Sequence, residues 1–127
     1  MIGTATSEAG AQAISDALST AGIKGRGMVL NVTDPASVEA VTKLVGEEFG
    51  APTILVNNAG ITRDNLMLRM TEEQWDEVIA TNLKSIFNLT KQVIRPMMKN
   101  RGGSIINMSS IVGITGNAGQ ANYAASK

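Results

Sequence analysis

The sequence contains no histidine and no cysteine among its 127 residues. It therefore lacks the side chain that most often carries protons near neutral pH, and it lacks the thiol needed for disulfide bonds and thiolate metal sites. No metal site is expected. If the protein performs acid–base chemistry on a small molecule, another group must carry the proton.

An excess of one charge is also absent, because 11 Lys and Arg residues balance 11 Asp and Glu residues. A nucleic acid partner would require a clustered basic excess, so none is expected. No apolar run approaches the ~20 residues that cross a bilayer. The start, MIGTATSEAG, lacks the basic and apolar segments of a signal peptide. We therefore expect a cytoplasmic protein with no membrane partner.

What the sequence does contain is an alternation of strand-like and helix-like stretches. Strands are expected at 2–5, 27–32, 53–60 (running into a turn) and 104–109, and helices at 8–21, 34–50, 71–100 and 122–127, with a loop at 110–120. Two helix starts are predicted from local signals: Asp34 before Pro35, and a capping box from Thr71 to Gln74. Pro96 should kink the third helix or mark its last turns. This order predicts βαβ units, an α/β fold with a parallel sheet, and a single domain over 1–127.

Polar residues follow three of the expected strands. Asn31 and Asp34 follow the second strand, residues 57–60 follow the third, and Ser109 and Ser110 follow the fourth. Because ligands bind beyond the carboxyl ends of the strands in such sheets, these residues predict a binding edge.

Tyr123, the only tyrosine, lies four residues before Lys127, so both face one side of the last expected helix. Taken singly, such a pair more often consists of two surface residues with no functional role. In the same way the stretch 57–60 (Asn-Asn-Ala-Gly) is compatible with an ordinary turn, Asn82 with a solvated helix residue, and Ser110 with one serine among several.

The order and spacing of these features resemble the short-chain dehydrogenase/reductase family over essentially the whole chain. The resemblance rests on Asn-Asn-Ala-Gly at 57–60, on Asn82, on Ser110 thirteen residues before Tyr123, and on Lys127. It implies a Rossmann-like, doubly wound parallel sheet. Residues 57–70 and 116–127 look most similar to the β-ketoacyl-[acyl carrier protein] reductases of type II fatty acid synthesis. That similarity implies NADPH-dependent reduction of a carrier-bound β-ketoacyl thioester to the 3-hydroxyacyl form, by a homotetramer.

The resemblance also implies four catalytic roles. Tyr123 would give a proton to the ketone oxygen as hydride arrives at the carbon. A free tyrosine has a pKa near ~10, and a neighbouring ammonium such as that of Lys127 favours the tyrosinate. Ser110 would hydrogen-bond the same oxygen as charge develops on it. Asn82 would anchor a water chain that resupplies the proton.

Further residues are implied to hold the cofactor. The turn formed by Asn58, Ala59 and Gly60 would face it, Tyr123 and Lys127 would lie at the nicotinamide ribose, and Asn31 with Val32 would lie beside the adenine. In this family the residues that follow the strand at 2–5 distinguish NADPH from NADH. Thr6 lies there with hydroxyl residues at positions 4 and 7, and hydroxyl groups can donate to a 2′-phosphate, which favours NADPH. Glu8 lies close enough to leave NADH open, since a carboxylate accepts from a 2′-hydroxyl.

The chain departs from the family in what it lacks. The family's first strand and Gly-rich pyrophosphate turn would precede Met1, and its last strands would follow Lys127. We therefore expect an internal segment, inactive in isolation, whose sheet has a gap between the strands at 2–5 and 53–56. Two alternatives remain: an acetoacetyl-CoA-type or other short-chain alcohol dehydrogenase, and a catalytically silent folded fragment that self-associates.

Overall fold

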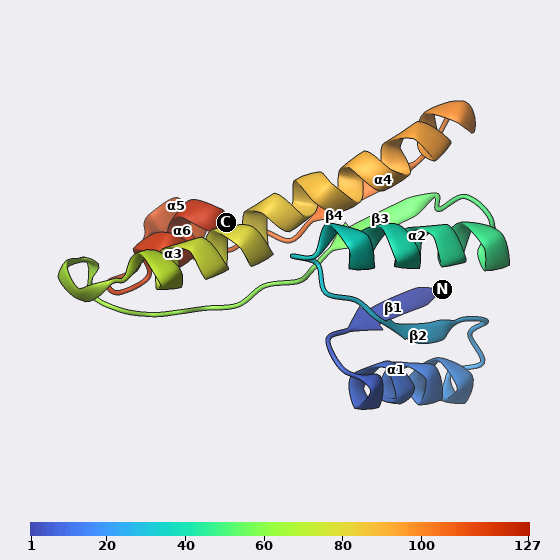
Figure 1. Ribbon diagram of the computed structural model, residues 1–127, viewed down its shortest axis with the longest axis horizontal. Helices are drawn as coiled ribbons and strands as arrows, with labels where there is room; N and C mark the ends of the chain where they lie inside the picture. The colour runs from blue at the N-terminus through green and yellow to red at the C-terminus, as the bar shows by residue number, and fades with distance from the viewer. The chain divides into compact units, whose positions relative to one another are not determined.

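The structure is a computed structural model that describes all of residues 1–127. Contacts group the chain into two compact units, Met1–Pro52 and Thr53–Lys127, and each is described by itself. Strands and helices alternate along the chain, as expected for an α/β protein (Figure 1).

The first unit consists of β1 (Ile2–Ala5), α1 (Glu8–Thr20), β2 (Arg26–Val29) and α2 (Pro35–Phe49). The two strands are parallel, in a register that runs from the Ile2–Arg26 pair to the Ala5–Val29 pair. Helix α1 packs against both strands (Figure 1). The fully buried side chains of this unit are all apolar: Ala11, Leu18, Met28, Leu30 and Val38.

Local capping explains the helices of the first unit. The Ser7 hydroxyl accepts a hydrogen bond from the Gly10 N–H at 3.1 Å and begins α1. The Asp34 carboxylate accepts from the Ala36 N–H at 3.0 Å, with a proline at the first helical position of α2. Gly50 ends α2 with φ of 82°, a conformation that favours glycine. Both expected helices are confirmed, while β2 ends earlier than expected, at the point where the pairing with β1 ends.

The second unit begins with β3 (Ile54–Asn57), which pairs in parallel with β4 (Ser104–Asn107). Between them come a short 3₁₀ turn η1 (Met67–Arg69) and the helical elements α3 (Glu72–Ile79), η2 (Ala80–Lys84) and α4 (Ser85–Lys99). After β4 come α5 (Val112–Thr115) and α6 (Ala121–Ser126), and α6 packs against both α5 and α3 (Figure 1).

The expected helix over 71–100 is continuous but not uniform. Its capping box is present: the Gln74 N–H donates to the Thr71 hydroxyl at 3.1 Å, and the Thr71 N–H donates to the Gln74 side-chain oxygen at 3.0 Å. The half-buried Trp75 follows in α3. The segment Ala80–Lys84 is π-helical, a feature that the sequence analysis did not predict. Pro96 lies in the last turn of α4, as one of its two expected roles required.

Two further features concern the strands and the loops. The parallel strands form two separate pairs, β1–β2 in the first unit and β3–β4 in the second. The expectation of a loop over 110–120 is wrong in part, because α5 forms one helical turn there, and the Ser110 hydroxyl accepts from the Val112 N–H at 3.2 Å near its start. None of the helices is both long enough and apolar enough to span a membrane.

Candidate active site

Helix α6 presents Tyr123 and Lys127 one turn apart on one face, both half-buried. The Lys127 ammonium nitrogen lies 6.0 Å from the centre of the Tyr123 ring. The same nitrogen donates to the Met108 carbonyl at 2.9 Å, which fixes its position. Lys127 is therefore a fixed side chain beside the Tyr123 ring rather than a free surface lysine.

This pair lines an open cleft of about 550 Å³ in the second unit. The other lining residues come from the segments after the carboxyl ends of β3 and β4: Asn58, Gly60, Ile61, Thr62, Arg63, Met108 and Ser109. Of the expected cofactor residues, Asn58, Gly60, Tyr123 and Lys127 are brought together here, and Ala59 lies exposed between the first two. The cleft occupies the position at which parallel sheets bind ligands.

Asn82 lies in the π-helical segment and is only 1% exposed, so it is not a solvated helix residue. Its side-chain oxygen accepts from the Ile61 N–H at 2.8 Å, and its NH₂ group donates to the Ile61 carbonyl at 3.0 Å and to the Ser126 hydroxyl at 3.0 Å. The neighbouring Gly60 approaches both Asn82 and Lys127, since a Cβ atom there would lie 3.5 Å and 3.4 Å from their polar ends. π-helical segments occur often at functional sites, and this one directs Asn82 at the backbone beside the cleft.

The two serines after β4 differ in position. Ser109 lines the cleft, and its hydroxyl donates to the Lys127 carbonyl at 2.9 Å. Ser110 is half-buried, and its hydroxyl accepts a hydrogen bond at the start of α5, which leaves its own proton available to donate.

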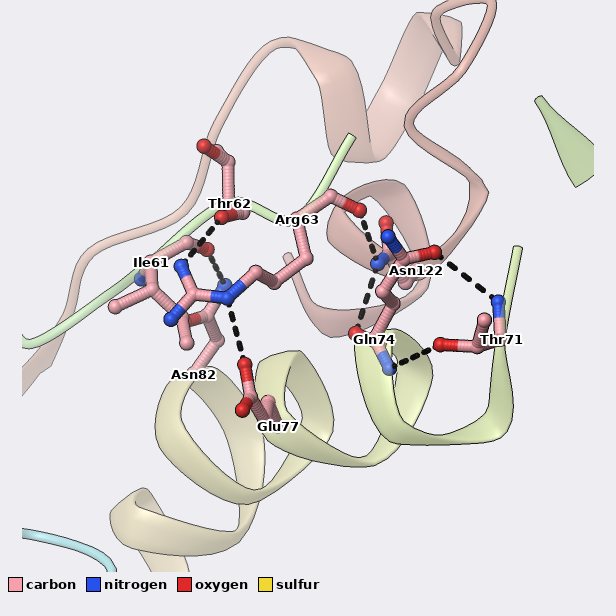
Figure 2. Close-up of polar contacts among 8 residues, drawn as sticks. All are labelled: Ile61, Thr62, Arg63, Thr71, Gln74, Glu77, Asn82 and Asn122. Atoms are coloured by element: carbon pink, nitrogen blue, oxygen red, sulfur yellow. Dashed lines mark hydrogen bonds and ion pairs between the residues drawn. The ribbon is translucent and has the colours of Figure 1, made fainter. Parts of the chain in front are cut away.

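Side chains that the sequence analysis did not single out hold these residues in place. The buried Asn122 and Ser126 fasten α6, and Arg63 forms an ion pair with Glu77 at 2.6 Å (Figure 2). The spacing of Asn122 and Ser126 repeats that of Tyr123 and Lys127 one residue earlier. This repetition was the only feature of the sequence that pointed to them.

The remaining expected cofactor residues belong to the first unit. Thr6 is exposed directly after β1, and Val32 is half-buried. The exposed Asn31 side-chain oxygen accepts from the Thr33 N–H at 3.1 Å and from the Thr33 hydroxyl at 2.7 Å. No group of three or more acidic side chains lies close enough to hold a metal ion.

Comparison with known proteins identifies the family of the chain. The model of the short chain dehydrogenase family matches residues 1–127. The 3-oxoacyl-[acyl-carrier-protein] reductases FabG of Escherichia coli K12 and Vibrio cholerae are 61% and 65% identical over the whole chain, which covers 51% of each. FabG of Pseudomonas aeruginosa is 51% identical over the same length and share. The chain thus spans about half the length of the curated relatives it matches.

Proposed function

Because this chain belongs to the short-chain dehydrogenase family, we propose that the protein containing it reduces a 3-oxoacyl thioester of acyl carrier protein to the 3-hydroxyacyl form with NADPH. The observation that carries the proposal is the convergence of Tyr123 and Lys127 with Asn58 and Gly60 on one cleft. The names of relatives 51–65% identical over all 127 residues support the substrate class.

The cleft residues suit the nicotinamide and ribose end of the cofactor. An ammonium has three N–H donors, and one of those of Lys127 is used by the Met108 carbonyl. The other two remain for ribose hydroxyls, together with the Tyr123 hydroxyl. Gly60 adds no side chain at the point where its backbone approaches Lys127. The bound cofactor supplies hydride to the ketone carbon of the substrate.

Tyr123 donates the proton that the ketone oxygen takes up. The Lys127 ammonium, held by the Met108 carbonyl, keeps a positive charge beside the Tyr123 ring while the proton leaves. The Ser110 hydroxyl donates to the same oxygen and stabilises the charge that develops there. No histidine takes part in this chemistry, and these 127 residues contain none.

In the resupply of the proton, Asn82 can act only as a hydrogen-bond acceptor. Both of its N–H donors are used, by Ile61 and Ser126, while its oxygen accepts only one hydrogen bond. An amide oxygen has two lone pairs, so the second can accept from a water. We therefore assign Asn82 as the acceptor that anchors the first water of the relay.

The cofactor preference rests on the first unit. Thr6 is exposed at the carboxyl end of β1 and can donate to a 2′-phosphate, whereas Glu8 lies in the first turn of α1. Asn31 and Val32 follow β2 and are assigned to the adenine. A Thr6→Asp substitution should therefore raise the KM for NADPH, because a carboxylate repels a 2′-phosphate.

The direct test is an absorbance assay of NADPH oxidation by the protein that contains these 127 residues. A 3-oxoacyl thioester should be reduced, and the form bound to acyl carrier protein should be preferred over the coenzyme A form. Equal use of both would favour an acetoacetyl-CoA-type reductase instead. The absence of any thioester-dependent oxidation would refute the proposal and favour a silent, self-associating protein.

Docking of the acidic carrier protein is assigned to the end of α4. Arg95, Lys99 and Arg101 are exposed there, and none of them forms an ion pair. Cations at a helix C-terminus also stabilise the helix by about 0.3–1 kcal/mol each, which is the simpler explanation. Reversing charge with Lys99→Glu/Arg101→Glu should reduce kcat/KM for the carrier-bound substrate and leave the coenzyme A form unchanged. If the preference for the carrier-bound substrate is unchanged, these cations only stabilise the helix end and do not bind the carrier protein.

We expect this reductase to be a cytoplasmic homotetramer that uses α4 as an interface. Large apolar side chains lie exposed along the helical stretch: Leu83, Phe87, Ile94 and Met98, with Phe87 63% exposed. A helix with apolar residues beyond its covered face needs a second partner surface. Light scattering that gives a monomer for the protein would remove this interface.

A further inference from the structure

Helix α6 carries two side-chain pairs with the same four-residue spacing. Tyr123 and Lys127 line the cleft, while Asn122 and Ser126 are 0% and 5% exposed and point into the protein. Successive helix residues are rotated by about 100°, so the buried pair lies on the face next to the cleft-lining pair. Because the helix turns as one body, a contact that holds Asn122 and Ser126 in place also sets the face on which Tyr123 lies.

Asn122 uses both of its N–H donors and one acceptor position of its oxygen, and Figure 2 shows the two donated bonds. Its NH₂ group donates to the Arg63 carbonyl at 2.9 Å and to the Gln74 carbonyl at 3.0 Å. Its oxygen accepts from the backbone N–H of Tyr123 at 2.8 Å. One buried amide thus joins α6 at Tyr123 to α3 and to the segment that follows β3.

Both partners of Asn122 are themselves held. The Gln74 side chain closes the capping box with Thr71, and the Arg63 guanidinium pairs with Glu77 of α3 (Figure 2). Two residues before Arg63, the backbone N–H and carbonyl of Ile61 both form hydrogen bonds with the Asn82 side chain. Asn122 is therefore anchored to a fixed frame rather than to a mobile loop.

Ser126 supplies the second attachment of the same helix. Its hydroxyl accepts from the Asn82 NH₂ group at 3.0 Å and donates to the Tyr123 carbonyl at 2.8 Å. No side chain caps the N-terminus of α6, so tertiary contacts such as these set how its first turn is oriented.

We propose that Asn122, assisted by Ser126, is a positioning residue that sets the rotation of α6 and thereby directs the Tyr123 hydroxyl into the cleft. The inference deepens the proposed function and rests on it for the role of Tyr123 as proton donor. Asn122 does not line the cleft and acts through the backbone of Tyr123.

The first test is amide hydrogen exchange, which needs no activity. In the protein that contains this chain, Asn122→Ala should speed exchange across residues 121–127, and Ser126→Ala should do so more weakly. The matched control is Asn117→Ala, since the Asn117 amide is exposed and donates only to the Gln120 side chain. Exchange of α6 that is equal in wild type and in both variants would overturn the proposal. If Asn122→Ala does not fold, Ser126→Ala decides the question.

The second test separates positioning from a general structural role. Asn122→Ala should lower kcat about 10- to 100-fold, as misplacement of a reacting group does, with a smaller rise in the KM for NADPH because Lys127 lies at the end of the same helix. In a Tyr123→Phe background the same substitution should cause no further loss, because the hydroxyl it directs is already gone. An equal loss in both backgrounds would show a structural role only and overturn the proposal. A wild-type protein without reductase activity would refute the proposed function, and the exchange experiment would still decide whether Asn122 fixes α6.

Discussion

The two units differ in what they bury. Every fully buried side chain of the first unit is apolar, whereas all five buried polar side chains belong to the second: Asn57, Asn82, Ser85, Asn122 and Ser126. The two buried side-chain atoms that have no hydrogen-bond partner, on Asn57 and Thr90, also lie in the second unit.

The difference shows how the second unit holds irregular segments in place. Apolar burial is non-directional, and it packs α1 onto a pair of strands with one directional bond beside it, from the Gly27 N–H to the Ser15 hydroxyl at 2.9 Å. The segment after β3 has no helix or strand partner along most of its length, and buried amides supply directional bonds that tie it to η2 and α6. A satisfied buried polar network specifies one arrangement, although it stabilises less than apolar packing of the same volume.

The largest expected effect separates chemistry from stability within the second unit. Tyr123→Phe removes only the hydroxyl of a half-buried side chain that lines the cleft. Turnover should fall by about 10²–10⁴-fold, the usual contribution of a general acid, while the melting temperature and cofactor affinity stay close to wild type. Steady-state kinetics and calorimetry with NADPH check this, and near-normal turnover would remove Tyr123 as the proton donor.

The next effect tests the apolar core of the first unit. Leu18→Ala removes a side chain that is 7% exposed on α1. The free energy of unfolding should fall by about 2–5 kcal/mol, because transfer and cavity terms add. Urea denaturation gives the value. The exposed Ala13 on the same helix provides the control, since Ala13→Ser should change stability by less than about 0.5 kcal/mol.

A smaller loss is expected from the polar core of the second unit. Asn82→Leu keeps the approximate volume but leaves the Ile61 N–H and carbonyl without their partners. Such unsatisfied groups cost about 1–3 kcal/mol. Asn88→Leu on α4 is the matched control, because no side-chain hydrogen bond is formed there. Equal stabilities for the two variants in urea would contradict the role assigned to the buried amide.

The smallest effect compares one helix start in each unit. Ser7→Ala removes a single capping bond from α1, and Thr71→Ala removes half of the capping box of α3. Each should cost about 0.5–2 kcal/mol of stability. Only Thr71→Ala should also raise hydrogen exchange in α6, because Gln74 links the capping box to Asn122. If hydrogen exchange in α6 rises in neither variant, the capping box of α3 is not coupled to α6 through Gln74 and Asn122.

The features predicted from the sequence were those with local causes. The starts of α2 and α3 follow from Asp34-Pro35 and from the Thr71 capping box, both encoded within four residues. The π-helical segment around Asn82 has no such local pattern, and the hydrogen bonds of Asn82 go to Ile61, 21 residues away. Asn122 escaped notice for the same reason, because its partners Arg63 and Gln74 are 59 and 48 residues distant. The expectation of one dinucleotide-binding domain over 1–127 and the assigned roles of the site residues stay predictions.

The half-buried Trp75 of α3 has an optical consequence. Trp75 and Tyr123 are the only tryptophan and tyrosine of these 127 residues, and both belong to the second unit. Within this chain, fluorescence emission therefore reports on the second unit alone, while far-ultraviolet circular dichroism reports on the helices of both. Denaturation curves that coincide by the two probes would show that the units melt as one cooperative body, and curves that separate would give each unit its own midpoint. The scarcity of aromatic side chains thus provides a built-in label for the unit that carries the cleft.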